Sequence, residues 1–432
     1  MEQPQSMKQL VEEIKNIYSD DPKIQAMFTY CFPNTYETTL KPQQDGTTFV
    51  ITGDIPAMWL RDSAAQVRPY LILAEEDAYM ADIVEGVIQR QFAFILHDPY
   101  ANAFNEEPNG RRYSNDQTDM TPLIWERKYE IDSLCYPIQL AYLFWKSTGR
   151  TSHFNERFLH AVERVISVWT TEQHHNRDSN YHFVRTNCTP QDTLSHNGNG
   201  APAGYTGMTW SGFRPSDDAC EYGYLIPSNM FAVVVLKQLA EVALNVLENG
   251  ELAESATLLA AEIDKGIQSY GRVEHPIYGT IYAYETDGWG NYNLMDDANV
   301  PSLLAMPYLG YCSINDPVYQ NTRKFLLSEA NPYYYQGSTA AGIGSPHTPE
   351  KYIWHIALAI QGMTAGTQKE KQSILELFKQ TDAGKNLMHE GFHADDPNKF
   401  TRDWFSWANS MFSEFILSMN GIYVSGSALD AQ

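Results

Sequence analysis

Residues 227–247, PSNMFAVVVLKQLAEVALNVL, decide the fold class of this chain. Apolar side chains recur in this stretch at spacings of three, four and seven residues, as on one buried face of an α-helix. They are Phe231, Val234, Val235, Leu239, Val242 and Leu247. Pro227 and Ser228 supply a start signal, because proline suits the first helical turn and serine caps free amide groups. The stretch therefore predicts a long helix that buries this face against other elements.

Comparable helical periodicity recurs from one end of the chain to the other. With a short apolar run at 300–309, the pattern predicts roughly twelve helices in all. The other helical ranges are 5–18, 63–76, 78–96, 130–148, 155–172, 250–270, 316–329, 350–366, 368–381 and 403–419. Strand-like alternation is confined to 48–52, 181–184 and 281–284, which we expect to form short β-hairpins on loops.

The connectors between these helices alternate between short and long. The long ones are polar and rich in glycine and aromatic residues, and loops of this length in a compact protein usually carry function; they are 99–127, 175–227, 285–300, 331–349 and 384–403. Such an alternation fits six antiparallel helical hairpins closed into an all-α (α/α)6 barrel. Two separate helical bundles are the competing arrangement. Because no compositional break marks a linker, we expect one domain over residues 1–432.

Charge and composition restrict the classes of partner. Lys and Arg number 30 against 53 Asp and Glu, which gives a formal net charge of −23 without an offsetting basic tract. This balance argues against binding to nucleic acid or to an anionic membrane and fits a neutral substrate, although acidity also serves solubility alone. Aromatic residues make up 13% of the chain, a richness found in carbohydrate-binding proteins as well as in ordinary cores.

The amino-terminal sequence and the cysteines bear on the compartment. The first ten residues lack a basic region followed by an apolar core, and nowhere do about 18 apolar residues run unbroken. We therefore expect a cytoplasmic protein. The five cysteines are scattered, odd in number and without a C-x-x-C pair, so neither a disulfide framework nor a thiolate metal site is indicated.

The segment 207–218 collects side chains that suit a sugar-cleaving pocket. Trp210 offers an apolar face for a pyranose ring, Arg214 can hold hydroxyls or a carboxylate, and Asp217 or Asp218 can act as an acid. Adjacent residues cannot point the same way in a regular conformation. One aspartate should therefore face the pocket, while the other should have a structural role in the loop.

Two further segments carry charge at expected helix starts. In 52–63, Asp54, Arg61 and Asp62 can bind sugar hydroxyls beside Trp59, or the Arg–Asp pair simply ties a loop to a helix. In 125–132, Glu126 and Arg127 can line the same end of the fold. The alternative interpretation is an acidic helix start stabilised by the helix dipole, which we favour for Glu130 and Asp132.

The segment His389-Glu390-x-x-His393 satisfies the H-E-x-x-H pattern of zinc peptidases, with Glu414 as a distant third ligand. That pattern binds zinc only on a helix, and Gly391 inside it favours a loop. In a loop, Glu390 is a carboxylate presented at the mouth of the fold.

Helix entrances at 345–348 and 402–409 add three more candidates. They contribute His347, Arg402 and Trp404. The alternative for such residues is a structural role, as a histidine hydrogen-bonded within its loop or a tryptophan packed in the core. Their shared position on long connectors favours a role in binding.

Four motifs together resemble glycoside hydrolase family 125, the bacterial exo-α-1,6-mannosidases. They are TGDIPAMWLRDS at 52–63, FRPSDD at 213–218, LIPSNMF at 225–231 and the MHE segment at 388–390, within a similarity that runs from about 25 to 420. The resemblance implies an (α/α)6 barrel and metal-independent hydrolysis, without a cofactor, of non-reducing terminal α-1,6-linked mannose from N-glycan-derived oligosaccharides. It also implies inversion at the anomeric carbon.

Carried onto this chain, the resemblance implies that Asp217 is the general acid, with Asp218 as the alternative, and that Glu390 is the general base. Inversion requires a protonated acid, an ionised base and room for a water, hence carboxyl groups roughly 6.5–9.5 Å apart. We expect burial or Asp218 to raise the pKa of the acid. Gly391 departs from the serine expected in relatives.

The residues expected to bind the sugar are Asp54, Trp59, Arg61, Asp62, Glu126, Arg127, Trp210, Arg214, Asn229, His347, Arg402 and Trp404. We expect a monomer or a weak homo-oligomer. A zinc peptidase and a mannoside-binding protein without catalysis remain the alternatives.

Overall fold

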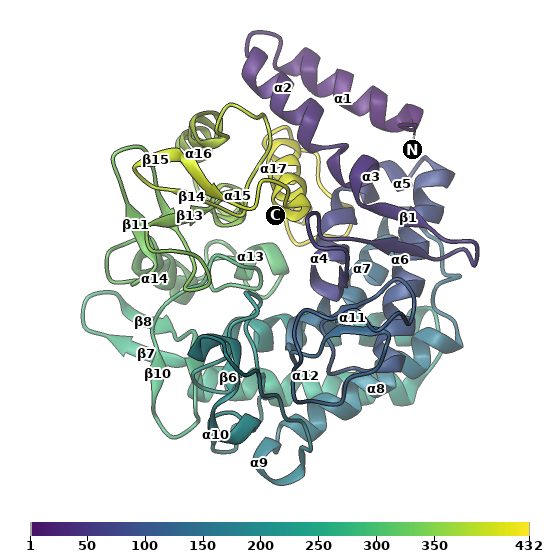
Figure 1. Ribbon diagram of the computed structural model, residues 1–432, viewed down its shortest axis with the longest axis vertical. Coiled ribbons are helices and arrows are strands. Elements are labelled where there is room, and N and C mark those ends of the chain that lie inside the picture. Colours follow the sequence, from purple (N-terminus) through teal and green to yellow (C-terminus); the bar gives the residue numbers. More distant parts are fainter. Residues whose placement is uncertain (1, 432) are drawn as a thin grey trace.

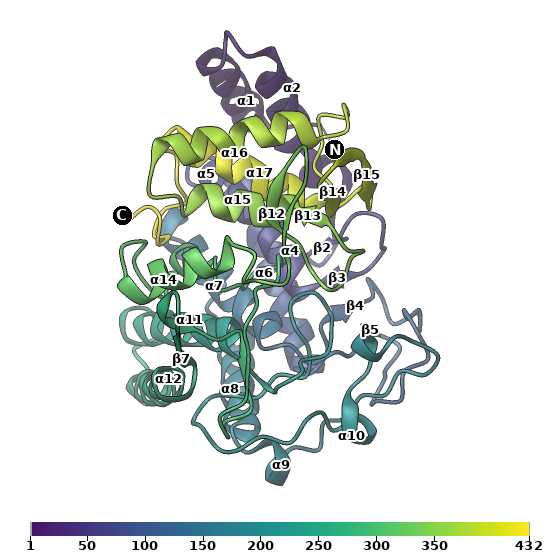
Figure 2. The same cartoon turned by 90° about the vertical axis from the view of Figure 1, so that its left-hand side faces the viewer.

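The helices of the computed structural model, which describes residues 2–431, form an inner and an outer layer (Figures 1 and 2). Each inner helix contacts the next along a path from α15 through α17, α4, α7 and α11 to α13. The bounds of these helices are His355–Met363, Ser406–Met419, Leu60–Val67, Ile131–Thr148, Ile226–Asn245 and Met306–Leu309. Their residues are almost all buried, because they are covered on both sides.

The outer helices pack on the inner ones and keep one polar face. α6 (Ala78–His97) packs on α7, α12 (Gly250–Tyr270) on α11, and α16 (Gln368–Thr381) on α15. The other helices are α1 (Gln5–Ile17), α2 (Pro22–Cys31), α3 (Asn34–Thr38), α5 (Leu71–Ala74), α8 (Glu156–Glu172), α9 (His175–Asp178), α10 (Ser195–Gly198) and α14 (Pro317–Leu326), with 3₁₀ turns at Arg68–Tyr70 and Pro190–Asp192. Helices α1 and α2 lie at one end of the longest axis (Figure 2).

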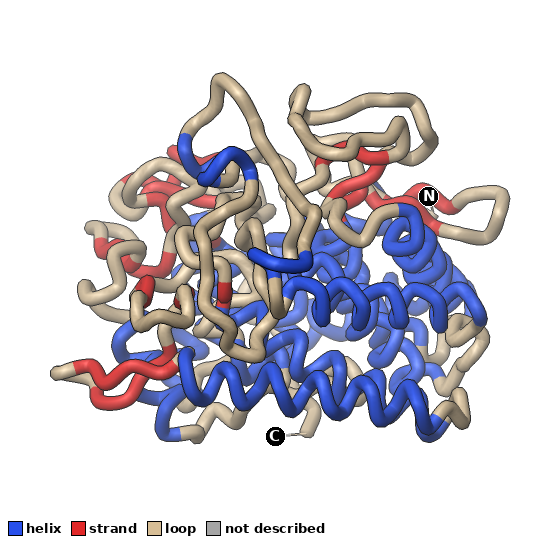
Figure 3. Tube along the Cα trace, turned by 90° about the horizontal axis from the view of Figure 1, so that it is seen from below, coloured by secondary structure: helices blue, strands red, loops and turns tan. Residues whose placement is uncertain are grey.

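The strands are short, antiparallel and placed on the connectors. Figure 3 shows most of them, with the long loops, gathered on one side of the helices. The sheets within residues 2–431 are β1–β2, β3–β4–β5, β6–β9–β10, β7–β8, β11–β12 and β13–β14–β15. Their bounds are Leu40–Pro42, Thr48–Val50, Met58–Trp59, Ala103–Phe104, Ile124–Glu126, Tyr224–Leu225, Arg272–His275, Gly279–Tyr282, Glu285–Thr286, Tyr292–Asn293, Tyr334–Gln336, Ala341–Ile343, Tyr352–Trp354, Gly391–His393 and Asp396–Thr401.

Most predicted helices are confirmed, and the differences have local causes. The predicted helix 63–76 is divided, because Pro69 lacks the amide hydrogen that a continuous helix needs after α4. The predicted helix 350–366 starts late, since β13 occupies its first residues. The run 300–309 keeps only its last turn as α13, and α2, α3, α9 and α10 were not predicted. The expected strand at 181–184 forms only one isolated bridge, between Val184 and Gln117.

Helix α11 holds the centre of the core. By length and composition it is the one helix among residues 2–431 that could cross a membrane, yet 83% of its apolar window is buried inside the protein. It packs against both α7 and α12. The ring of Phe231 meets that of Tyr136 on α7 edge to face, with centroids 5.1 Å apart. The apolar face that the sequence predicted is therefore covered by neighbouring helices.

The Phe231→Ala substitution should reduce the free energy of unfolding by about 3–5 kcal/mol, because it removes a fully buried ring and leaves a cavity. Leu244→Ala on the same helix is the control, since Leu244 is 60% exposed and its loss should change the free energy by no more than about 0.5 kcal/mol. Denaturant unfolding of both variants measures the difference. Equal effects would show that the inner face of α11 does not hold the core.

Candidate active site

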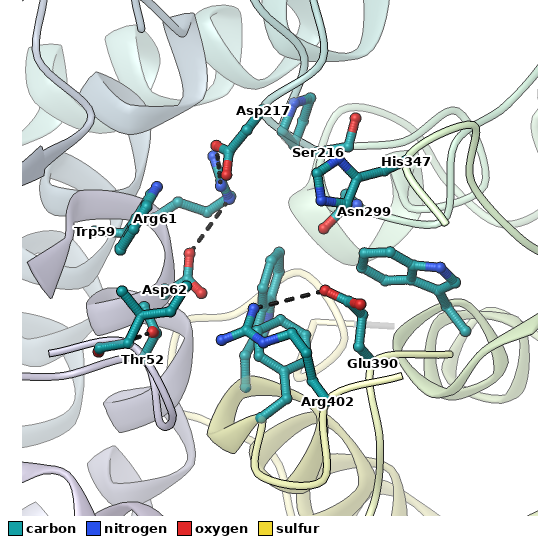
Figure 4. A pocket seen from close by; sticks show the side chains of 15 residues that line it. Thr52, Trp59, Arg61, Asp62, Ser216, Asp217, Asn299, His347, Glu390 and Arg402 are labelled. Carbon is teal, nitrogen blue, oxygen red and sulfur yellow. Dashed lines mark hydrogen bonds and ion pairs between the residues drawn. The ribbon is translucent and has the colours of Figure 1, made fainter. Parts of the chain in front are cut away.

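A polar pocket opens among the connectors (Figure 4). Loops from distant parts of the chain line it. The lining residues are Thr52, Ile55, Trp59, Arg61, Asp62, Pro215, Ser216, Asp217, Asn299, His347, Trp354, Glu390, Arg402, Phe405 and Trp407. Seven of the sequence-predicted residues are among them: Asp217, Glu390, Trp59, Arg61, Asp62, His347 and Arg402.

The pocket lies at the amino-terminal ends of three inner helices. Trp59, Trp354 and Phe405 are the extended residues that directly precede α4, α15 and α17, and all three line the pocket. The chain passes from strand or loop into helix at each of these points. The aromatic walls are thus held at the starts of rigid buried helices, which fixes their position better than a loop would.

Asp217 and Asp218 point in different directions, as expected for neighbours. Asp217 has a left-handed backbone conformation, with φ of 67°, in a turn in which the amide of Arg214 donates to the carbonyl of Asp218 (2.7 Å). Its carboxylate lines the pocket. Asp218 instead accepts a hydrogen bond from Nδ1 of His347 (2.9 Å). A left-handed conformation at a non-glycine residue is uncommon, so the surrounding structure holds this turn to present Asp217.

The surroundings of Asp217 favour its ionised form. Burial acts to raise the pKa of its carboxyl group, but the charge of Arg61 and a hydrogen bond with Glu130 lower that pKa below its usual range. Nη2 of Arg61 lies 3.1 Å from Oδ1 of Asp217, and Nδ2 of Asn102 donates to the same oxygen at 3.3 Å. The shift is opposite in sign to the one expected from the sequence, because Arg61 lies beside this carboxylate.

Glu390 lies across the pocket from Asp217 in a simpler environment (Figure 4). It comes from the turn before β14 and is almost fully buried. Nη1 of Arg402 lies 3.6 Å from Oε1 of Glu390, and Nε of Arg402 donates to Asp54 at 3.0 Å. Burial acts to lower the pKa of Arg402, but Asp54 and Glu390 raise it. A permanent positive charge therefore lies next to Glu390.

The structure places five of the other predicted sugar-binding residues in packing or ion-pair roles outside this pocket. Trp210 is fully buried and stacks on His175, with centroids 3.5 Å apart, so it cannot form a wall for a sugar. Arg214 pairs with Glu285 (2.6 Å) and Arg127 with Asp98 (2.7 Å). The remaining two are Glu126, bound to Arg185 (2.6 Å), and Asn229, which exchanges hydrogen bonds with the backbone of Thr209 (2.9 and 3.0 Å).

Three more candidates lie beside the pocket without lining it. The carbonyl of Trp404 packs against Gly53, and its indole donates to Ser406 (3.2 Å). Asp54 is at the rim and reaches the pocket only through Arg402. Asp218 acts through His347. Such roles cannot be read from residue type, because they depend on which way each loop turns.

Eight lining residues were not on the predicted list. Phe405 and Trp407 belong to a segment that the sequence did single out, and Thr52 and Ile55 flank Asp54 in another. Asn299 lies on one of the predicted long connectors. Their position on segments already expected to carry function was the only sequence feature that indicated a place in the pocket for these five residues. No feature of the sequence marks Trp354.

The H-E-x-x-H segment is not helical. His389 and Glu390 lie in an irregular turn and His393 ends β14, where residues four apart are separated by roughly 13 Å. His389 stacks on Phe400 (3.9 Å) and His393 packs on Tyr352 (5.6 Å). Glu414 accepts a hydrogen bond from Tyr308 (3.0 Å) within the core. The zinc-peptidase hypothesis is therefore wrong, because its two imidazoles do not share a helix face.

Two carboxylates that face one pocket are the arrangement found in glycoside hydrolases. Residues 21–417 match the metal-independent α-mannosidases, and the chain belongs to this family, glycoside hydrolase family 125 (GH125).

Two relatives are similar over nearly the whole chain. It is 41% identical over 436 residues to the meiotically up-regulated gene 157 protein of Schizosaccharomyces pombe. That similarity covers 96% of this chain and 85% of the relative. It is 49% identical to a Streptococcus pneumoniae protein of a metal-independent α-mannosidase family, solved as a non-productive substrate complex with α-1,6-mannobiose. That similarity covers 100% of this chain and 99% of the other, with a TM-score of 0.94.

A more distant likeness concerns the fold alone. A bacterial glucoamylase solved with acarbose is 12% identical, with a TM-score of 0.56, over 86% of this chain and 50% of that one.

The His347–Asp218 pair should make stability depend on pH. Burial acts to lower the pKa of His347, but Asp218 raises it from 6.5 to about 9. The pair therefore stabilises the folded state fully below pH 6.5, and the stabilisation is lost as the pH rises through about 9. Thermal unfolding of His347→Gln should show its largest deficit below pH 6.5, a deficit that shrinks between pH 6.5 and about 9, and little deficit above that. The exposed His160→Gln is the control and should show no such trend; a constant deficit for His347→Gln would contradict the assignment.

Proposed function

We propose that this protein is an exo-acting, inverting α-1,6-mannosidase that removes non-reducing terminal mannose from N-glycan-derived oligosaccharides. The observation that carries the proposal is that Asp217 and Glu390, from separate loops, point into one small pocket. Membership of the metal-independent α-mannosidase family supports the substrate class. The α-1,6-mannobiose in the Streptococcus pneumoniae structure supports the linkage.

In this mechanism Asp217 protonates the glycosidic oxygen while Glu390 takes a proton from the attacking water. The water adds to the anomeric carbon on the face opposite to the leaving group, so the configuration inverts. The two carboxyl groups should therefore lie roughly 6.5–9.5 Å apart. Nη1 of Arg402 keeps a positive charge 3.6 Å from Oε1 of Glu390, and Asp62 and His347 bind sugar hydroxyls from the wall of the pocket.

Exo action fits a pocket rather than an open groove. Aromatic residues Trp59, Trp354 and Trp407 line the space beside the polar groups, as expected for a site that holds one pyranose ring by its apolar face and its hydroxyls. A chain end can enter such a space, whereas an internal residue of a glycan cannot. Arg61, in contrast, is occupied by carboxylates and holds the acid rather than the sugar.

We also propose that residues 1–432 form a single (α/α)6 catalytic domain. Support comes from the path of inner helices and from one hydrophobic core with members from Met7 to Leu429. The acidic composition supports a neutral oligosaccharide partner, with neither nucleic acid nor membrane as partner. A cytoplasmic location and a monomer or weak homo-oligomer complete the proposal.

Asp217→Asn and Glu390→Gln should each reduce kcat on α-1,6-mannobiose by about 10²–10⁴-fold, because each amide lacks the required proton donor or acceptor. Released mannose measures the loss, and thermal unfolding checks that the fold is intact. Glu350→Gln, an exposed carboxylate near His347 in the sequence, is the control and should keep normal turnover. Normal turnover in Asp217→Asn together with loss in Asp218→Asn would move the acid by one residue. A protein that binds mannobiose without any turnover would be a binding protein instead.

The mannose first released should be the β-anomer, because a single displacement on an α-linkage inverts the configuration. Proton NMR of the anomeric signals in the first minutes, before mutarotation, measures this. Initial release of α-mannose would instead show retention and a covalent intermediate on one of the carboxylates.

A further inference from the structure

Three buried carboxylates, and the partly exposed carboxylate of Asp217, surround one guanidinium at the wall of the pocket. Nη1 of Arg61 lies 2.5 Å from Glu130 and 3.3 Å from Asp132, while Nη2 lies 3.1 Å from Asp217. Nε of Arg61 lies 3.5 Å from Asp62. The side chains of Glu130 and Asp132 are completely buried. One positive charge therefore faces four groups that would be negative in water.

Neighbouring cations, among them the charged imidazole of His347, offset this excess only in part. Nζ of Lys128 donates to the backbone carbonyl of Asp217 and to Asp192. Arg185 is bound to Asp116 and Glu126, and Arg402 to Asp54 and Glu390. Because unpaired buried charges are costly, a group in this cluster must keep its proton at neutral pH.

Glu130 is the group best placed to keep it. Its Oε2 accepts hydrogen bonds from Arg61 (2.5 Å) and from Oγ of Ser133 (2.8 Å). Its Oε1 receives only a long contact from Asn102 (3.5 Å), and the same amide group reaches Asp217 (3.3 Å). Oε1 of Glu130 and Oδ1 of Asp217 thus lie beside the same amide nitrogen of Asn102, and a proton held by Glu130 can be shared with Asp217.

The directions of the pKa shifts in the cluster agree with this geometry. Burial raises the pKa of Glu130 well above its usual range, and the charge of Asp217 adds to the rise against the opposing effect of Arg61. Burial also raises the pKa values of Asp62 and Asp132, but only to about 6. The hydrogen bond between the two carboxyl groups has the opposite effect on Asp217. At neutral pH the shared proton thus belongs to Glu130.

We propose that Glu130 is a positioning residue that stores the proton which Asp217 delivers to the leaving group. This inference rests on the proposed function. Asp217, ionised before the step, takes the proton of Glu130 and passes it to the glycosidic oxygen as the bond from the anomeric carbon to that oxygen breaks, so Asp217 is again a carboxylate when the step ends.

The step leaves Glu130 as a carboxylate held by Arg61 and Ser133. Water bonds to the anomeric carbon and gives its proton to Glu390. After the products leave, solvent carries that proton back to Glu130, so one water is consumed and no net proton is gained or lost. The arrangement lets an aspartate that is ionised in the empty pocket serve as a general acid.

The test compares two substrates in the full-length protein. α-1,6-Mannobiose needs a protonated leaving oxygen, whereas the fluoride of α-mannosyl fluoride departs almost without acid assistance. Glu130→Gln keeps a hydrogen-bond donor toward Asp217 but cannot release its proton. It should lower kcat on mannobiose by about 100-fold or more while leaving turnover of the fluoride nearly unchanged. Asp217→Asn should show the same selectivity.

Asp132→Asn is the matched control, because Asp132 is an equally buried carboxylate bound to the same Arg61 Nη1 but does not contact Asp217. Its loss should affect both substrates by the same factor. If Glu130→Gln does not fold, Ser133→Ala serves instead. It removes a hydrogen bond to the carboxylate that forms during the step, and it should lower kcat on mannobiose selectively, by about tenfold.

Each outcome bears on a different assignment. Equal losses on both substrates in Glu130→Gln, or normal turnover of mannobiose, would overturn the role of Glu130 while leaving Asp217 as the acid. Normal mannobiose turnover in Asp217→Asn would instead refute the proposed acid, and with it this inference. A wild-type protein inactive on both substrates would refute the proposed function itself.

Discussion

The cluster of acidic groups around Arg61 is the constraint on which the site depends. The guanidinium joins the first turn of α4 to the start of α7 and to the loop that carries Asp217. It is 3% exposed and lies over the ring of Trp407, with 5.9 Å between the guanidinium carbon and the centroid. A buried arginine with several partners is costly to disturb, because removal of the cation leaves uncompensated carboxylates. The position of Asp217 thus follows from the same interaction that connects the inner helices.

The two carboxylates that face the pocket have unlike environments. Asp217 is linked through Arg61 to buried carboxyl groups, one of which, Glu130, has a pKa that burial raises well above its usual range. Glu390 contacts a single cation, Arg402, which the exposed Asp54 also binds. The difference arises from the neighbouring groups, since Asp217 shares Arg61 with three other carboxylates whereas Glu390 contacts Arg402.

The site could be predicted from the sequence where a motif lies at a helix start or on a long connector. Arg61 and Asp62 begin a helix at a loop boundary, and Glu390 and Arg402 occupy long connectors, so each was expected at the mouth of the fold and lies there. Trp210 and Arg214 share a segment with Asp217 but turn away from the pocket. Glu130 and Asp132 were correctly expected at a helix start, yet their interaction with Arg61 was not foreseen. Local pattern does not show which distant side chain will meet a buried carboxylate.

The sequence by itself determined the class of the fold, because an apolar face with helical spacing must be buried whatever its partners are. It also determined which connectors are long enough to carry a site, and its motifs indicated the family. Tertiary structure alone decided which residues of those connectors face the pocket. It also reversed the expected pKa shift of Asp217, because it places Arg61 beside that carboxylate. The physical reason is that helix formation depends on neighbours within a few residues, whereas ionisation depends on charges and burial supplied by segments far apart in the chain.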